Sequence, residues 1–184
     1  YVVSRSNPSY RILPYHLTNE GAGVAVAKNN TTGLLGEIDS ELAAFRQNGT
    51  LDKIIGNWIR QDGSDYVVTQ FDTQGTTSHT VVLPPLRVGT SANREPMCFV
   101  RNNTISGLDW ELMMRIGHAL GREVEFVDMK YAALIAALQS GKVDAVASNM
   151  TATAERKKQV DFSAVYFVNP QVLIEWVPAT AAGV

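Results

Sequence analysis

The sequence predicts an α/β fold, a three-layer αβα lobe in which helices cover both faces of a mostly parallel sheet. Short β-branched apolar runs alternate with longer segments whose apolar residues recur at helical spacing. Alternation of this kind is typical of βαβ units, whose strands lie parallel. The 184 residues are 45% hydrophobic and 18% charged, a composition that predicts a globular chain with its own core.

Residues 1–62 contain two predicted strands, over 10–13 and 23–27. Two predicted helices follow, separated by Gly49, the second covering about 51–59. Apolar side chains at helical spacing predict them: Leu34, Leu35, Ile38, Leu42 and Phe45 in the first, and Ile54, Ile55 and Trp58 in the second.

Residues 63–85 are rich in Gly, Ser, Thr, Asp and Gln and end on two prolines, a composition that predicts a linker. The alternative is a strand ribbon, because residues 66–68 and 79–83 form two apolar runs that are able to pair.

Residues 86–176 alternate between strands and helices, and residues 177–184 form a tail. The helix predicted over 108–120 has one apolar face and ends at Gly121. We expect strands over 86–89, 124–127, 143–147 and 165–174, and helices over 108–120 and 131–138.

Composition excludes several classes of function. The net charge of −2 gives no electrostatic reason to expect nucleic acid or anionic lipid as a partner. Three scattered histidines and one cysteine, Cys98, predict neither a metal site nor an internal disulfide, and no cofactor motif is present. No apolar run approaches the ~20 residues of a membrane span. The pattern begins abruptly at Tyr1, which suggests a segment of a longer protein with room for an upstream export signal.

Two loops follow predicted strands, over 90–96 and 148–156. In open α/β sheets, ligands bind beyond the carboxyl ends of the strands. In the second loop, Thr153 is a predicted N-cap and Arg156 lies in the first helical turn. Free backbone N–H groups, a planar guanidinium and the Thr151 hydroxyl together suit a carboxylate. The alternative is that Arg156 pairs with Glu155 or solvent on a helix surface.

The run Met150–Ser163, read as MTATAERKKQVDFS, resembles a signature of the periplasmic binding proteins of polar-amino-acid ABC transporters, the type II, family 3 solute-binding group. Residues 86–90, 96–99, 107–109 and 136–145 resemble the same group. The resemblance implies a type II periplasmic-binding-protein-like lobe.

Residues 1–62 also resemble this family, but they resemble its end. Residues 23–27 are similar to the strand that returns to the first lobe, and residues 45–58 to the terminal helices. The order is therefore inverted, which a parent with tandem binding domains or a circular permutation explains. The second lobe, inserted between these pieces in the family, is absent. We expect 1–62 and 86–176 to form one lobe, within one chain or by exchange in a domain-swapped dimer.

The resemblance also implies roles for single residues. Arg156 corresponds to the arginine that takes the ligand α-carboxylate, assisted by Thr151 and the backbone N–H groups of Asn149 and Thr151. Tyr131 stands where the family places an aromatic against the ligand side chain, with ordinary helix packing as the alternative.

Ser91 and Arg94 stand at pocket positions where the family often has an acidic or polar residue and an aromatic residue, respectively. Arg94 is a departure that favours an acidic ligand, and the alternative is that it points to solvent.

The function that the resemblance implies is extracytoplasmic binding of an amino acid or similar small carboxylate. Such binding serves ABC-transporter uptake or membrane-receptor sensing, so the partners are a permease or a sensor kinase of the parent system. The location is periplasmic or extracellular, with a membrane tether through the parent as one arrangement. Since the family's ammonium-binding acid belongs to the missing lobe, we expect this chain alone to bind weakly.

We do not expect an enzyme. The alternative is a lyase of the cyclohexadienyl-dehydratase type, which needs a positioned acid or base. The two loops offer five candidate residues, and only Glu95 among them is able to serve: Ser91, Arg94, Glu95, Thr151 and Arg156.

Overall fold

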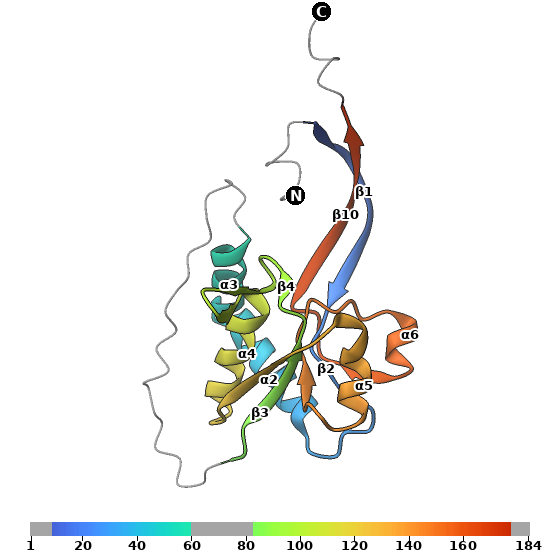
Figure 1. Cartoon of the computed structure of the whole chain (residues 1–184). Helices are drawn as coiled ribbons and strands as arrows, with labels where there is room; N and C mark the ends of the chain where they lie inside the picture. The colour runs from blue at the N-terminus through green and yellow to red at the C-terminus, as the bar shows by residue number, and fades with distance from the viewer. Residues whose placement is uncertain (1–8, 60–82, 178–184) are drawn as a thin grey trace, which may run out of the picture.

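A computed structural model describes residues 9–59 and 83–177. Its central sheet has five strands in the order β7-β3-β8-β2-β9 (Figure 1). β3 is parallel to β7 and β8, while β2 is antiparallel to β8 and β9, so four of the five strands run the same way. The predicted α/β class with a mostly parallel sheet is confirmed. The strands are β7 (Val124–Asp128), β3 (Leu86–Thr90), β8 (Ala145–Val146), β2 (Ala25–Ala27) and β9 (Val160–Phe162).

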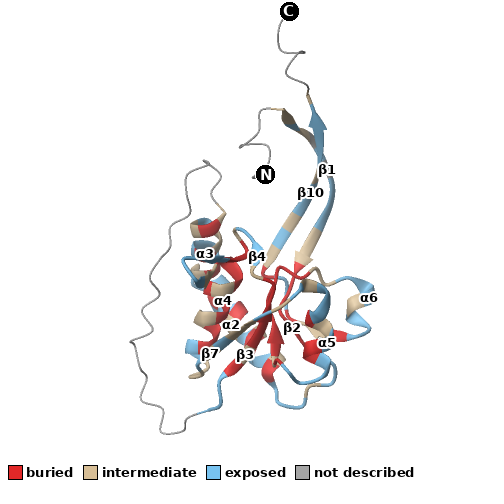
Figure 2. Ribbon diagram, in the orientation of Figure 1, coloured by how far each residue is buried: buried red, intermediate tan, exposed pale blue. Residues whose placement is uncertain are grey.

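Helices lie on both faces of this sheet, which makes three layers (Figure 1). One core cluster joins α2 (Leu34–Gln47), α3 (Thr50–Trp58) and α4 (Leu108–Ala119) to the sheet. A second cluster joins α5 (Leu134–Gln139) to the opposite face. Figure 2 shows the buried residues concentrated in the strands between these helices. Successive residues of β2 serve different faces, because side chains alternate along a strand.

The first and last segments of the chain share this sheet and its core. β2, from the first segment, lies between β8 and β9 of the last segment. Leu34, Ile38 and Leu42 of α2 are buried in the same cluster as Leu112 and Ile116 of α4. Burial of such side chains is worth about 1.5–3 kcal/mol each, so the two segments stabilise one another strongly.

A two-stranded ribbon extends from the body of the lobe (Figure 1). It pairs β1 (Tyr10–Ala22) with β10 (Phe167–Trp176), from Ala22 opposite Phe167 at the base to Tyr10 opposite Trp176 at the far end. β1 is much longer than the strand predicted over 10–13, because pairing with β10 extends it through polar sequence. A register shift between Ile12 and His16 brackets Pro14, which lacks the N–H that a regular ladder needs.

A second, three-stranded sheet was not predicted. It consists of β4 (Asn93–Arg94), β5 (Cys98–Arg101) and β6 (Thr104–Ser106), part of which was expected to be loop. The turn between β5 and β6 contains Asn102 and Asn103 with φ of 50° and 62°. Two consecutive positive φ angles suit a tight hairpin, and asparagine tolerates them.

Other expectations are confirmed or refined. Gly121 has φ of 66° just beyond α4, as expected of a helix terminator. The helix predicted over 131–138 begins as a 3₁₀ turn, η1 (Tyr131–Ala133), before α5.

The linker or ribbon predicted over 63–85 falls almost wholly outside the described residues. Within the described ranges, no helix is both long and apolar enough to cross a membrane, and no cluster of His, Cys, Asp and Glu is suited to a metal.

Candidate functional site

The two predicted loops meet at the carboxyl edge of the parallel strands. β3 ends at Thr90 and β8 ends at Val146, and these neighbouring strands run in the same direction. The backbone N–H of Ser91 donates a 3.1 Å hydrogen bond to Ser148 Oγ, which joins the loops directly. This edge is where an open α/β sheet binds its ligands.

Tyr131 brings two predicted arginines together at this edge. The guanidinium carbon of Arg94 lies 5.5 Å from the centroid of the Tyr131 ring, and that of Arg156 lies at the same distance. Both distances fall within the range of a cation–π contact. The two cations are therefore no more than twice that distance apart, although β4, η1 and α6 (Ala154–Lys157) supply the three residues.

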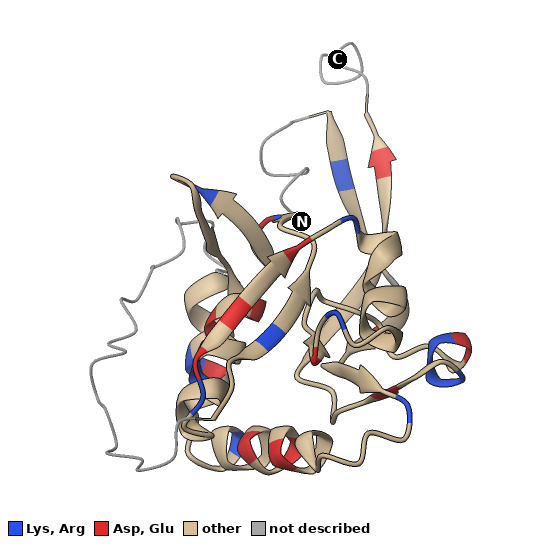
Figure 3. Cartoon of the chain, turned by 60° about the horizontal axis from the view of Figure 1, so that its bottom comes forward, with Lys and Arg blue, Asp and Glu red and all other residues tan. Residues whose placement is uncertain are grey.

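Neither guanidinium makes an ion pair with a carboxylate among residues 9–59 and 83–177. Arg156 does not pair with Glu155, which instead binds Lys158 at 2.9 Å. Elsewhere among the described residues, Lys and Arg positions are interspersed with Asp and Glu positions (Figure 3). Two neighbouring cations without anionic partners favour an anionic ligand.

Arg156 is held by its own loop. Thr153 caps α6, and its Oγ1 accepts a 3.3 Å hydrogen bond from the Arg156 N–H, as predicted. One guanidinium nitrogen, Nη1, donates to the Thr151 carbonyl at 3.0 Å. Since α6 is a single turn of four residues, its dipole is small. The side chain of Arg156, more than the helix end, provides the positive charge.

Thr151 links this loop to the ribbon. Its hydroxyl donates a 2.9 Å hydrogen bond to Glu20 Oε2 in β1. Ala22 forms an isolated antiparallel bridge with Thr151, and the Ala152 N–H donates to the Gly21 carbonyl at 3.0 Å. Glu20 was not identified from the sequence, because no local pattern indicates that β1 passes this loop.

Asn149 is nearly buried and has φ of 47°. Its side chain exchanges two hydrogen bonds, of 3.1 and 2.9 Å, with that of Asn169 in β10. Asparagine is among the few residues that adopt this left-handed conformation readily. Ser91 is also buried, and its hydroxyl bonds Asn93 at 3.2 Å. The side chains of both predicted site residues are thus hydrogen-bonded to other side chains of the protein.

A buried acid lies behind the loops. Asp109 Oδ1 accepts a 2.6 Å hydrogen bond from the Tyr166 hydroxyl, while Oδ2 has no partner among the described residues. Burial raises the pKa of Asp109 from 3.8 to about 7, and the Tyr166 hydroxyl and the backbone of Asn149 offset this only in part. The N-cap of α4 is Gly107, so Asp109 lies inside the first turn of the helix and does not cap it.

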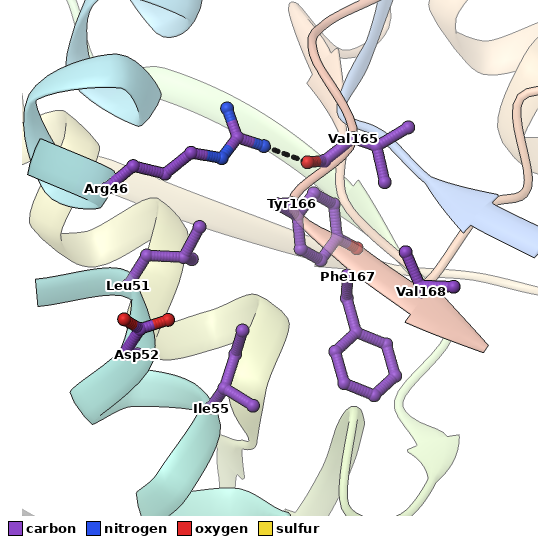
Figure 4. Close-up of a pocket in the computed structure, with 8 residues that line it drawn as sticks. All are labelled: Arg46, Leu51, Asp52, Ile55, Val165, Tyr166, Phe167 and Val168. Carbon is purple, nitrogen blue, oxygen red and sulfur yellow. Dashed lines mark hydrogen bonds between the residues drawn. The ribbon is translucent and has the colours of Figure 1, made fainter. Parts of the chain in front are cut away.

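A separate hollow of about 620 Å³ lies between α3 and the start of β10 (Figure 4). Leu51, Ile55 and Phe167 line it, and Arg46 closes one end by bonding the Val165 carbonyl. None of the predicted site residues lines it.

Comparison with known proteins identifies relatives of the last segment. Residues 86–176 match the family model of bacterial extracellular solute-binding proteins, family 3. The Arginine-binding extracellular protein ArtP of Bacillus subtilis is 44% identical over 89 residues, covering 48% of this chain and 35% of that protein. A Probable histidine-binding protein of Campylobacter jejuni is 37% identical over 90 residues, covering 49% and 35%. The chain thus spans about a third of the length of these relatives.

Similar chains are also found among solved structures. An ancestral arginine-binding protein bound to arginine is 50% identical, with a TM-score of 0.45 over 45% of this chain and 37% of that one. The arginine-bound form of domain 1 from TmArgBP is 44% identical, with a TM-score of 0.39 over 40% of this chain and 59% of that one.

Proposed function

Because residues 86–176 belong to the bacterial extracellular solute-binding proteins of family 3, we propose that this chain binds an amino acid by its α-carboxylate, with Arg156 as the principal contact. One observation carries the proposal most directly. Arg156 and Arg94 share the ring of Tyr131 at the carboxyl edge of the sheet, and neither has a carboxylate partner among the described residues. A guanidinium binds a carboxylate through two parallel hydrogen bonds, and Thr151 holds Arg156 in place for this role.

The second arginine favours an acidic side chain on the ligand. The relatives are named for binding arginine and histidine, and one for glutamine, so what these ligands share is the amino-acid head. In this chain Arg94 adds a cation beside Tyr131, where a cationic ligand side chain meets like-charge repulsion. Glutamate or aspartate offers a second carboxylate instead. Ser91 and Asn149 support the loops beneath these contacts.

Binding without turnover fits the site better than catalysis. Glu95, the acid of the first loop, is exposed and pairs with Arg101 at 3.4 Å. Asp109 has a pKa near neutrality, but it is completely buried and bonded to Tyr166, so a substrate does not reach it. A general acid or base must lie within hydrogen-bond reach of the reacting group.

The proposal extends to the parent protein. We place it in the periplasm or outside the cell, where it serves a permease or a membrane sensor kinase and is tethered to the membrane in the sensor arrangement. Residues 1–62 and 86–176 form its first lobe, and the second lobe lies elsewhere in a tandem or permuted parent. The shared core of α2, α3 and α4 supports a single lobe within one chain.

The test is a titration of the ¹⁵N-labelled chain with glutamate, followed by NMR, which measures weak affinities. Arg156→Ala is expected to lower the affinity roughly 10- to 150-fold, the effect of about 1.5–3 kcal/mol for a bond to a charged group. Lys157→Ala is the matched control, because Lys157 is the exposed neighbour on the same turn. Equal affinities of the two variants would rule out Arg156 as the carboxylate contact.

A further inference from the structure

Glu20 places a carboxylate at the candidate site that the sequence did not indicate. Its Oε2 accepts the 2.9 Å hydrogen bond from the Thr151 hydroxyl, and the Thr151 carbonyl accepts the 3.0 Å bond from Arg156. A negative and a positive side chain therefore bind opposite polar groups of one residue. An α-amino acid has the same arrangement of charge, since its ammonium and carboxylate groups are attached to a single carbon.

The position of Glu20 is fixed by its surroundings. In the ribbon it lies opposite Asn169, whose amide is bonded to Asn149 in the same loop as Thr151. The bridge from Ala22 to Thr151 fixes the backbone two residues further on. A group that is already held in place loses little conformational entropy when it binds a ligand.

Glu20 also lacks a cationic partner. The ion pairs among residues 9–59 and 83–177 do not include it, although its side chain is half-buried. An ionised carboxylate accepts up to about four hydrogen bonds, and the Thr151 hydroxyl supplies one of them. A partly desolvated carboxylate with free acceptor positions is well suited to an ammonium group.

We propose that Glu20 binds the ammonium group of the amino acid whose carboxylate Arg156 takes. This inference rests on the proposed function and adds a second contact to it. Both charges of the ligand head are then recognised within this chain. From the sequence, the ammonium was expected to be left without a partner, because that role was assigned to the missing lobe.

A pair of ligands isolates the ammonium contact. L-glutamate and glutarate have the same two carboxylates and the same chain length, but glutarate lacks the amino group. By NMR titration of the 184-residue chain, we expect glutamate to bind about 10- to 150-fold more tightly than glutarate, the range for a charge-assisted bond. Glu20→Gln should abolish this preference and leave glutarate binding intact or strengthened.

The amide oxygen that Glu20→Gln introduces still accepts the Thr151 hydroxyl, so a merely structural role predicts no change in preference. Glu37→Gln is the control, because it removes the same charge from an exposed position on α2. Equal wild-type affinities for the two ligands, or a preference that survives in Glu20→Gln, would overturn the assignment. If Arg156→Ala still weakens both ligands, the proposed function stands. Absence of binding by the wild-type chain to either ligand overturns both proposals.

Discussion

The indole nitrogen of Trp58 donates a 2.7 Å hydrogen bond to Glu111 Oε2 inside the core, and this bond joins the first segment of the chain to the last. Trp58 comes from α3 and Glu111 from α4, and both are almost fully buried. The other oxygen of Glu111 accepts two bonds from Arg115, of 2.9 and 2.7 Å. The carboxylate is thus paired and hydrogen-bonded, as a buried charge must be.

Trp58→Phe removes this donor and keeps most of the aromatic bulk. We expect the free energy of unfolding to fall by about 1–3 kcal/mol, because Glu111 loses one of its hydrogen bonds in a dry environment. Urea unfolding followed by circular dichroism measures the change. Trp110→Phe, at a half-exposed position of α4, serves as the control. Equal costs for the two variants would show that the Trp58–Glu111 bond does not stabilise the lobe.

Substitution of glycine by alanine is expected to have opposite effects on the stability of the fold at two positions. Gly107 has φ of 127°, and a Cβ there would lie 2.3 Å from the Met97 carbonyl oxygen. Gly107→Ala should therefore destabilise the fold by about 2 kcal/mol or more. Gly36 lies in α2 with open space around it, so Gly36→Ala should stabilise the fold by about 0.5–1 kcal/mol. Thermal unfolding distinguishes them: stabilisation by Gly107→Ala would contradict the packing around Gly107, and destabilisation by Gly36→Ala would contradict the open space at Gly36.

Elements that depend on residues close together in the sequence were predicted correctly. Helix α2 was predicted from the spacing of Leu34, Ile38 and Leu42, which marks one helix face, and all three are buried. Thr153 was identified as a cap because a threonine before a helical turn meets a local need for a hydrogen-bond acceptor. The β-hairpin at Asn102 was missed, since Asn-Asn is a weaker turn signal than Asn-Gly.

Long-range relationships were harder to predict. Arg94 and Arg156 were both named as candidates, but their common contact with Tyr131 depends on three separate elements. Glu20 was overlooked because its role depends on strand pairing 131 residues away, at Thr151. The extent of β1 follows from its partner β10 rather than from its own polar sequence.

Arg94 gives a prediction about ligand choice. Arg94→Phe removes one cation and retains a contact with Tyr131, so the preference for glutamate over arginine should fall by about tenfold, or roughly 1.4 kcal/mol. NMR titration of the chain with both amino acids measures the ratio. Arg101→Ala is the control, because Arg101 pairs with Glu95 on the exposed hairpin. A wild-type chain that prefers arginine would contradict the proposed role of Arg94.

Asp109 makes the stability of the lobe depend on pH. Burial raises its pKa from 3.8 to about 7, so the folded protein retains a proton that the unfolded chain releases near pH 4. The contribution of this bound proton to the free energy of unfolding is complete below about pH 4. It declines as the pH rises and is lost above about pH 7. The size of the effect is on the order of a few kcal/mol, since one pKa unit corresponds to about 1.4 kcal/mol.

Asp109→Asn tests this dependence, because the amide does not titrate and its oxygen is still able to accept the Tyr166 hydroxyl. Thermal unfolding of both proteins between about pH 4.5 and 8, values chosen to bracket that decline, gives the difference in stability at each pH. The wild-type protein should lose stability relative to the variant as the pH rises. Asp144 and Asp161 do not produce the same trend. Their pKa values are lowered, chiefly by Arg87 and Lys28 against the effect of burial, so their contributions are lost at more acidic pH. A constant difference across this range would mean that Asp109 is ionised throughout, with Tyr166 and Asn149 compensating fully for its burial.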